Sequence, residues 1–353
     1  MDKRYFSEKV VKWYLQHQRE LPWRADQEPY KIWLSEIILQ QTRIIQGLPY
    51  YLRFIEEFPT VKFLANAPEQ KVLRLWQGLG YYTRARNLHK CAKAVMNIHK
   101  GTFPGSFEKL KTLPGIGDYT AAAISSIAFN EAVAVVDGNV FRVLSRIFGI
   151  DDPINSPQGK KKFTLLANEL VDKKHPGQHN QAVMEFGALH CTPKNPICTT
   201  CVFKSTCFAF KHELQHVLPV KIKAKAARKR YFYYIVIKKG TSLLMKKRGP
   251  KDIWHGLYDF YLIEKKRPTA IGNLLSDDEH LKTLALKKDD IKISETYRHI
   301  LSHQIILSRF VHIDHHKAFT IRDKNLKFYT KRQVSDLPKA VLISQFLADE
   351  QLL

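Results

Sequence analysis

The chain has 353 residues, which is enough for two domains that each bury a core. Its 57 lysines and arginines outnumber its 33 aspartates and glutamates, so the formal net charge is +24 and the pI is about 9.7. This charge favours a polyanionic partner, and the absence of any apolar run of about 18 residues argues against an integral membrane protein.

Two further features of the sequence bear on where the protein works. The first 20 residues form a charged, amphipathic segment without the apolar core of a signal peptide. Four of the five cysteines lie between residues 191 and 207, which argues against a secreted disulfide framework. We therefore expect a cytoplasmic protein, specifically a bacterial one that is associated with the nucleoid.

A strongly apolar helix is expected over residues 31–45, KIWLSEIILQQTRII. Glu36 interrupts its apolar pattern. One interpretation places this carboxyl group on an exposed polar strip with Gln40 and Arg43. The other places it in an apolar pocket, where desolvation raises its pKa until it can donate a proton near neutral pH.

Residues 77–86, QGLGYYTRAR, combine two glycines, two tyrosines and two arginines between predicted helices. A surface of this composition can insert an apolar group into a stack of DNA bases. A tight turn between two helices, with a tyrosine in the core, explains the same residues. Both interpretations stay open on local evidence.

The stretch from Leu113 to Ile147 combines two elements of a nucleic-acid site. It opens with a hairpin, LPGIG, in which Gly115 and Gly117 let backbone N–H groups approach a phosphate at the start of a helix. It then reaches Asp137, which follows an apolar run and stands at the start of a second helix. We expect this stretch to grip DNA at one end and to carry out chemistry with Asp137 at the other.

Four cysteines in the pattern Cys191-x6-Cys198-x2-Cys201-x5-Cys207 predict one metal centre. Zinc and a [4Fe–4S] cluster both take four thiolates, and the spacing does not separate them. The remaining cysteine, Cys91, is expected to be a buried core thiol. The residues therefore predict a metal site and leave the metal open.

The pattern of secondary structure changes near residue 230. Helical spacing dominates before that point, and no convincing strand precedes it. Residues 221–230, KIKAKAARKR, carry six basic groups and no acid, as expected of an exposed linker. Beyond them strands are expected in YFYYIVIKKG and TSLLMKKR and at residues 257–263, 304–313 and 326–329, with a helix at 335–348. The second domain is therefore expected to be α+β.

The LPGIG hairpin, the segment VDGNVFRVLSR and the cysteine pattern together resemble the helix-hairpin-helix DNA glycosylases that carry an iron–sulfur cluster. The resemblance covers residues 1 to about 215. Within that superfamily the chain is most similar to the MutY family of adenine DNA glycosylases, which remove adenine mispaired with 8-oxoguanine or guanine.

Three features favour the MutY family over its relative endonuclease III. Tyr119 stands where endonuclease III carries the lysine that forms a Schiff base with the sugar. The segment WLSEIILQQT matches the MutY helix whose acid falls on Glu36. The chain also continues for about 140 residues beyond the cysteines, a length that resembles the Nudix-like domain of MutY.

The resemblance implies a multidomain fold. An all-α helix-hairpin-helix glycosylase domain with an Fe–S cluster loop would span residues 1–217, and a basic linker would span residues 218–230. An α+β Nudix-like domain that recognises 8-oxoguanine would follow at residues 231–353. The acidic Nudix box that binds metal is absent, so the resemblance implies recognition of a base without hydrolysis of a nucleotide.

For the chemistry, the resemblance implies that Glu36 protonates N7 of a flipped adenine. Asp137 would stabilise the oxocarbenium ion at C1′, or bond to it transiently, and help to deliver water. Tyr119 and Asn139 match positions beside that carboxylate. The adenine pocket matches Trp23, Arg24, Leu39 and Gln181. The cluster would be one structural [4Fe–4S] centre on Cys191, Cys198, Cys201 and Cys207.

The groups that contact DNA and 8-oxoguanine follow from the same resemblance. In the first domain they match Gln41, Thr42, Leu79, Tyr81, Gly115 and Gly117. In the second domain, Leu301, Ser302 and His303 match the family's Phe-Ser-His loop over 8-oxoguanine. Leu301 replaces the phenylalanine, so the intercalating aromatic group of that loop is missing.

The sequence thus predicts a monofunctional adenine DNA glycosylase of base excision repair, acting as a monomer on double-stranded DNA with A:8-oxoguanine or A:G mispairs. Three alternatives remain, namely an endonuclease III-like bifunctional glycosylase and lyase, a non-catalytic iron–sulfur DNA-binding protein, and a Nudix hydrolase. The presence of both Glu36 and Asp137 argues against the second alternative. The missing acidic box argues against the third.

Overall fold

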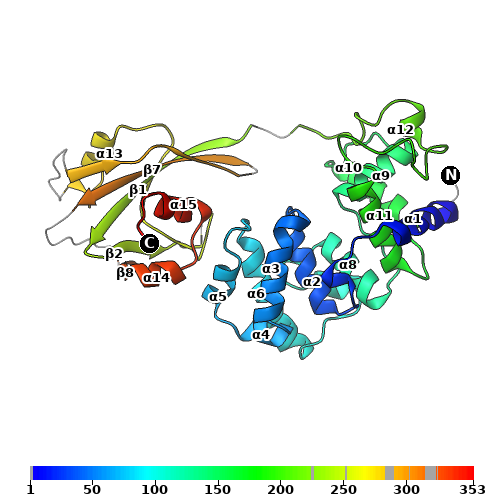
Figure 1. The fold of residues 1–353 in the computed structure, drawn as a ribbon, viewed down its shortest axis with the longest axis horizontal. Helices are drawn as coiled ribbons and strands as arrows, with labels where there is room; N and C mark the ends of the chain where they lie inside the picture. Colours follow the sequence, from blue (N-terminus) through cyan, green and yellow to red (C-terminus); the bar gives the residue numbers. More distant parts are fainter. Residues whose placement is uncertain are drawn as a thin grey trace. The chain divides into compact units, whose positions relative to one another are not determined.

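The computed structural model describes residues 3–223, 226–250, 253–282, 290–301, 303–314, 323 and 325–353. The chain divides into two compact units (Figure 1). The first unit comprises Met1–Asn66 and Asn87–Ala224, and the second comprises Ala67–Arg86 and Lys225–Leu353. Within the described residues, no helix is both long enough and apolar enough to cross a membrane.

The first unit is helical throughout its described secondary structure. Its elements are α1 (Lys3–His17), η1 (Pro22–Arg24), α2 (Pro29–Leu39), α3 (Ile44–Glu57), α4 (Val61–Asn66), α7 (Phe107–Lys111), α8 (Asp118–Phe129), α9 (Gly138–Phe148), α10 (Pro157–Leu170), α11 (Pro176–Leu189) and α12 (Phe208–Lys211). The long helix α6 (Thr83–His99) begins in the second unit and ends in the first.

Helices α1, α9, α10 and α11 share one hydrophobic core, because their apolar residues recur at helical spacing on the sides that face each other. Val10, Val143 and Phe186 are among its fully buried side chains. Helix α11 packs closely on the start of α9, since a Cβ added to Gly187 would lie 2.6 Å from the Cβ of Asn139. Glycine therefore permits the contact that places the first turn of α9.

The apolar stretch 31–45 is not a single helix, which corrects the sequence prediction. Helix α2 ends at Leu39, Gln41 adopts a positive φ of 55°, and α3 begins at Ile44. The apolar pattern runs across this break because both helices bury their apolar sides in the unit. The spacing of apolar residues predicts which sides of the helices are buried, but it does not predict the break between the two helices.

The second unit is α+β, and its strands form one eight-stranded sheet. The strands are β1 (Arg228–Lys239), β2 (Ser242–Lys247), β3 (Tyr258–Asp259), β4 (Tyr261–Lys265), β5 (Ile291–Ile293), β6 (Tyr297–Ile300), β7 (Gln304–Asp314) and β8 (Leu326–Thr330). The helices are α5 (Glu69–Leu75), α13 (Ile271–Asp277), α14 (Lys331–Asp336) and α15 (Val341–Asp349).

Strands β1 and β7 run parallel along the centre of the sheet, in a register that pairs Arg228 with Gln304 (Figure 1). Strands β4 and β2 pair with β1 on its other edge, and β6 and β5 pair with β7. Both faces of β1 are buried, which explains its nearly continuous apolar run. On one face, the Phe310 ring stacks on Phe346 of α15 with centroids 3.6 Å apart.

The expected fold class, an all-α domain followed by an α+β domain, is confirmed. The expected basic linker, residues 218–230, is shorter in the structure. Leu218 is buried in the core of the first unit, and the backbone of Ile222 accepts and donates hydrogen bonds with the Asn155 side chain. At the other end, β1 already begins at Arg228, so a strand precedes residue 230. Basic composition indicated exposure, and it gave no information about backbone pairing.

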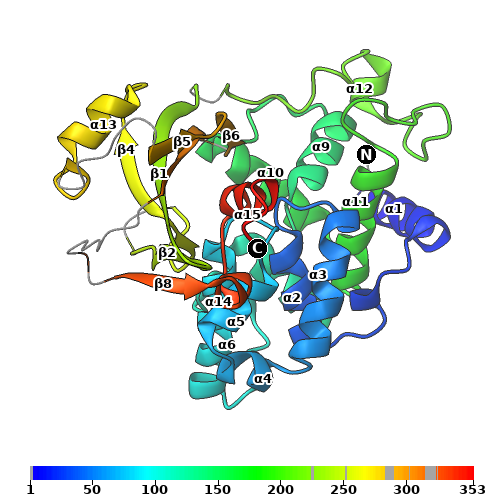
Figure 2. The ribbon, with the colours of Figure 1, turned by 60° about the vertical axis from the view of Figure 1, so that its left-hand side comes forward.

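Two further boundaries differ from the predictions. The expected helix at 335–348 is two helices, α14 and α15, because Pro338 lacks the backbone N–H that a continuing helix needs (Figure 2). Residues 67–86 belong to the compact unit of the second domain, although the sequence placed them inside a continuous first domain.

Candidate active site

Glu36 of α2 and Tyr119 of α8 meet inside the first unit. The Tyr119 hydroxyl donates a hydrogen bond of 2.5 Å to Oε2 of Glu36, across 83 positions of the sequence. The neighbouring Gln40 amide donates to the Thr120 hydroxyl, so a second contact holds the two helices in the same register. Glu36 therefore lies in a protein pocket, and the exposed strip with Arg43 is the wrong interpretation.

The environment of Glu36 keeps its proton available near neutral pH. The pKa of this carboxyl group is raised from 4.5 to about 7. Burial is the largest cause and the negative charge of Asp137 adds to it, while the Tyr119 hydrogen bond and the Arg24 charge oppose the rise. A carboxyl group with such a pKa can act as a general acid at neutral pH.

Asp137 is the N-cap of α9, and its carboxylate is held by three hydrogen bonds. The backbone N–H groups of Asn139 and Val140 donate to Oδ1 at 2.8 Å, and the Asn139 side-chain amide donates to Oδ2 at 2.7 Å. Burial raises the pKa of Asp137, and these hydrogen bonds oppose that rise. The start of an eleven-residue helix also favours negative charge at this position.

The two carboxyl groups therefore have different protonation tendencies. Glu36 accepts one neutral hydrogen bond, whereas Asp137 accepts three, two of them from the first turn of a helix. An ionised Asp137 repels a second negative charge and so favours the protonated form of Glu36. Such a pair can combine proton donation by one group with stabilisation of positive charge by the other.

Of the four residues expected in an adenine pocket, the structure brings two together. Arg24 and Gln181 line one cavity of the first unit, with Tyr14, His175 and Gln178 among its other polar walls. The Tyr14 hydroxyl donates to Oε1 of Gln181 at 2.9 Å. Trp23 and Leu39 do not line this cavity: Trp23 is buried edge-on against the Tyr51 ring, and Leu39 ends α2.

Glu185 is a residue of this region that the sequence did not reveal. Its carboxylate accepts hydrogen bonds from both Arg19 and Arg24, with the closest contacts at 2.7 and 2.8 Å. Burial alone would raise its pKa, yet the two guanidinium groups lower it to about 2. The available signal was its position four residues after Gln181, which places both side chains on one side of α11.

Arg142 connects the start of α9 with the cysteine loop. One NH2 group of its guanidinium donates to Oδ1 of Asn139 at 2.8 Å and to the Gly187 carbonyl at 2.7 Å, and its Nε donates to the Cys191 carbonyl at 2.7 Å. Arg142 thereby orients the Asn139 amide, whose N–H group faces Asp137.

Two glycines shape the hairpin that precedes α8. Gly115 has a φ of +79°, and a Cβ there would lie 2.6 Å from the Asn87 Cβ, so another residue would be strained. Gly117 is the N-cap of α8, and a Cβ there would meet open space. The hairpin thus presents the start of a twelve-residue helix without side-chain cover, as an anion site requires.

The residues expected to contact DNA lie in both units. Gln41 and Thr42 occupy the break between α2 and α3 in the first unit. Leu79 and Tyr81 belong to the second unit, where Tyr81 has a φ of 48° and is 45% exposed. Leu301 and His303 flank the turn between β6 and β7 in the same unit, and Ser302 lies outside the described residues.

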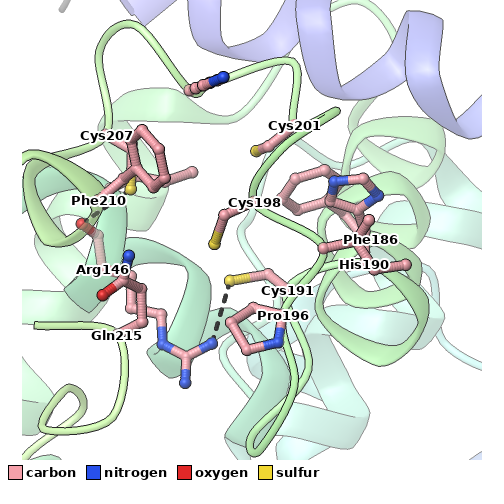
Figure 3. Close-up of a pocket in the computed structure, with 13 residues that line it drawn as sticks. Arg146, Phe186, His190, Cys191, Pro196, Cys198, Cys201, Cys207, Phe210 and Gln215 are labelled. Carbon is pink, nitrogen blue, oxygen red and sulfur yellow. Dashed lines mark hydrogen bonds between the residues drawn. The ribbon is translucent and has the colours of Figure 1, made fainter. Parts of the chain in front are cut away.

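The four clustered cysteines line one cavity of the first unit, together with Phe186, His190, Arg146 and Phe210 (Figure 3). One NH1 group of Arg146 lies 3.5 Å from the Cys191 sulfur and also donates to the Thr192 carbonyl at 2.7 Å. Nε of Arg146 donates to the Leu218 carbonyl, so this side chain ties the start of the cysteine segment, residues 191–207, and the later residue Leu218 to α9. Cys91 is fully buried elsewhere, as expected, and burial raises its pKa to about 12.

Residues 34–171 match the HhH-GPD superfamily of base excision DNA repair proteins, and residues 232–349 match the NUDIX domain. The chain is 33% identical over 348 residues to the adenine DNA glycosylase of Buchnera aphidicola subsp. Schizaphis graminum, covering 95% of this chain and 96% of the relative. It is 43% identical over 213 residues to the human adenine DNA glycosylase, covering 58% of this chain and 39% of the human protein.

Solved structures resemble the first part of the chain. A thermostable thymine-DNA glycosylase is 28% identical, with a TM-score of 0.55, and the match covers 60% of this chain and 97% of that one. A non-covalent endonuclease III–DNA complex is 21% identical, with a TM-score of 0.52, and the match covers 61% of this chain and 99% of that one. The latter shows the shared fold alone, and the match to the HhH-GPD superfamily confirms the helix-hairpin-helix expectation.

The raised pKa of Glu36 implies that its ionisation destabilises the folded state. The folded state holds the Glu36 proton up to about pH 7 and the unfolded state only up to about 4.5, so this contribution to stability falls as pH rises through that window. We predict that Glu36→Gln raises the free energy of unfolding above about pH 8 by on the order of 2 to 3 kcal/mol more than it does below about pH 4.

Urea unfolding of both proteins across this pH range measures the difference. Glu56→Gln, at an exposed position, is the matched control variant and is measured at the same pH values. A Glu36→Gln difference that does not depend on pH would contradict the assignment of the raised pKa to Glu36.

Proposed function

The chain belongs to the adenine DNA glycosylase family, and from this premise we propose that it excises adenine mispaired with 8-oxoguanine or guanine and leaves an abasic site without breaking the strand. The observation that carries the proposal is the pairing of Glu36 with Tyr119 beside Asp137.

Glu36 is the proposed general acid. Its Oε2 accepts the Tyr119 hydrogen bond, which leaves Oε1 as the oxygen that can carry and donate a proton. Transfer of that proton to N7 of an adenine extruded from the duplex makes the base a neutral leaving group. The pKa of about 7 leaves much of Glu36 protonated at neutral pH, so the donor is available before the base arrives.

Asp137 is the proposed group that stabilises the sugar. Departure of the base leaves positive charge on the sugar ring, and a carboxylate held in place by Asn139 and Val140 needs no reorganisation to face that charge. It can then form a transient bond to C1′ or take a proton from the attacking water.

The proposal that the enzyme stops at the abasic site rests on Tyr119. A lyase step needs an amine that forms an imine with C1′, and a phenol cannot form one. In the described part of the chain, none of the groups that shift the pKa of Glu36 or Asp137 is a lysine. The endonuclease III-like alternative would have to recruit a lysine from outside this set.

Recognition of the mispair is assigned to residues of both units. Gln41, Thr42, Leu79 and Tyr81 would fill the gap left by the adenine and hold the opposite base, with Gly115 and Gly117 on a backbone phosphate. Arg24 and Gln181 would contact the adenine from the polar cavity that they line. Trp23 and Leu39, which do not line that cavity, would contact the base from another side. Leu301, Ser302 and His303 would read 8-oxoguanine from the second unit.

Cys191, Cys198, Cys201 and Cys207 would hold one [4Fe–4S] cluster. Their side chains surround a single cavity, and no three His, Cys, Asp or Glu side chains among the described residues are placed to share one metal ion. Four thiolates around a larger group fit a cluster better than zinc. When bound, the cluster supplies a covalent cross-link that joins the loop between Cys191 and Cys207 into one structure.

We place the protein on double-stranded DNA in a bacterial cytoplasm, with the nucleoid, and we propose that it acts as a monomer. The net charge of +24 supports the DNA partner, because basic side chains displace counterions from the phosphate backbone. The relative that it matches over nearly its whole length is bacterial, which supports the compartment.

Single-turnover assays on three duplexes test the function. We expect adenine release opposite 8-oxoguanine and opposite guanine, no release of thymine glycol, and strand breakage only after alkali or heat. Asp137→Asn should lower the rate by at least about a hundredfold, since the fixed negative charge at the sugar is lost. Efficient borohydride trapping would instead support the lyase, and an unchanged rate in Asp137→Asn would support a non-catalytic protein.

The pH dependence of adenine release tests the acid. The Tyr119 hydrogen bond lowers the pKa of Glu36, so its removal in Tyr119→Phe should raise that pKa and keep the acid protonated to higher pH. We predict that the alkaline limb of the rate profile, near about pH 7 in the natural protein, moves upward in Tyr119→Phe. Tyr14→Phe, which removes a hydroxyl bound to Gln181 instead, should leave the limb in place.

Two single cysteine substitutions, one in the cavity and one outside it, test the cluster assignment. Cys201→Ser should lose most of the bound iron and sulfide, with their visible absorption, and should lower the midpoint of thermal unfolding because the cross-link is lost. Cys91→Ser, at the buried cysteine outside the cavity, should keep its iron. Zinc in place of iron in the natural protein would contradict the cluster.

A further inference from the structure

The loop between α5 and α6, residues 76–82, is built to present Tyr81. Gly78, Gly80 and Tyr81 all have positive φ, so the backbone turns back on itself twice. The Trp76 indole donates to the Gly80 carbonyl at 2.9 Å. The Arg84 guanidinium lies over the Tyr81 ring, 5.5 Å from its centre, and over the Trp76 ring at 5.1 Å. Tyr81 is thus held in a strained backbone with its ring partly in solvent.

The base of this loop is bonded to the α+β part of the second unit. The Gln77 side chain accepts a hydrogen bond from the Lys339 backbone N–H at 3.1 Å and donates to the Ser344 hydroxyl at 3.0 Å. The buried Tyr82 hydroxyl donates to the Lys339 carbonyl at 3.0 Å. Residues on both sides of Tyr81 therefore hold the backbone of the same residue, Gln77 at the N–H and Tyr82 at the carbonyl of Lys339.

The turn between α14 and α15, to which the loop is hydrogen-bonded, is itself held in place by hydrogen bonds. Lys339 is 2% exposed, and its ammonium group donates to the carbonyls of Val334 and Leu337 at the end of α14. A buried ammonium that is bound to two carbonyls fixes the turn between α14 and α15. Helix α15, which follows, stacks Phe346 on the sheet residue Phe310. Contacts thus run without interruption from the loop to the sheet.

A second attachment lies at the start of α6. One NH1 group of Arg86 donates to the His255 carbonyl at 2.5 Å. His255 sits between Trp254, with a φ of 62°, and Gly256, with a φ of +84°, and a Cβ on Gly256 would lie 3.2 Å from Leu73 of α5. The helices on both sides of the loop therefore contact the same α+β body.

We propose that Gln77, Tyr82 and Arg86 are positioning residues for mispair recognition, through which the second domain sets the place of Tyr81. The inference rests on the proposed function, in which Tyr81 contacts the base opposite the adenine. Tyr81 and the turn that carries Leu301 and His303 belong to one compact unit. In this arrangement the second domain contacts the opposite base through the turn that carries Leu301 and His303. It also supports the loop of residues 76–82, which precedes that domain in the sequence.

The preference for 8-oxoguanine over guanine gives a way to measure whether these contacts position Tyr81. 8-Oxoguanine and guanine differ at O8 and N7, so the preference between them depends on groups placed to a fraction of an ångström around the base. Loosening Tyr81 should reduce that preference while Glu36 and Asp137, in the first unit, keep their geometry. Unfolding or general loss of packing would instead lower the rates on both mispairs by the same factor.

Single-turnover rates on A:8-oxoguanine and A:G duplexes test the proposal in Tyr82→Phe, Gln77→Ala and the double variant. We expect the ratio of the two rates to fall by about tenfold in the double variant, with the A:G rate nearly unchanged. Tyr231→Phe, in β1 of the same unit and outside this network, is the matched control and should keep the ratio. In a Tyr81→Ala background the same substitutions should lower the ratio no further.

Equal falls on both mispairs, an unchanged ratio, or a full effect in the Tyr81→Ala background would each overturn the inference. Amide hydrogen exchange of residues 77–82 in the free protein gives a readout that needs no catalysis. We expect faster exchange there in the double variant and not in Tyr231→Phe, and unchanged exchange would overturn the inference as well. Failure of the natural protein to release adenine would contradict the proposed function, while the exchange result would still decide the support of the loop.

Discussion

The hydrogen bond between Tyr119 and Glu36 is the contact on which the candidate site depends. It joins α2 to α8 inside the first unit and brings a carboxyl group out of water beside a second one, Asp137. Removing two carboxyl groups from water is unfavourable unless their protonation states separate. The fold separates them, because the start of α9 and Asn139 stabilise the charge on Asp137, whereas the charge on Glu36 is stabilised by the Tyr119 phenol and the positive charge of Arg24 alone among the causes that shift its pKa.

Buried arginines organise what surrounds this pair. Arg24 reaches Glu185 together with Arg19, and Arg142 connects Asn139 with the Cys191 carbonyl. Arg146 binds the carbonyls of Thr192, at the start of the cysteine segment, and of Leu218, beyond it. Each guanidinium satisfies several acceptors in fixed directions, which a lysine could not do. These four arginines therefore have an internal structural use in the first unit.

The second unit includes residues 67–86 because these residues contact segments that lie far away in the sequence. Residues 67–86 stand among helices in the sequence, yet Gln77 and Tyr82 form hydrogen bonds with the backbone N–H and carbonyl of Lys339, more than 250 positions later. The loop that carries Tyr81 and the turn beside His303 thus share one body. Under the proposed function, this unit would contact the base opposite the adenine, while Glu36 and Asp137 lie in the first unit.

By itself, the sequence determined the two carboxyl groups, the glycine hairpin, the four clustered cysteines, the fold class and the family. Each is a local signal, such as a spacing, a period or a change of period, and local signals are set by neighbours along the chain. Only the tertiary structure decided that Glu36 meets Tyr119 and that Glu185 binds Arg24. It also decided that α2 stops at Leu39 and that residues 67–86 join the second unit. Periodicity reveals that a side is buried, but the partner that buries it comes from distant segments, and their packing is fixed only when the whole chain folds.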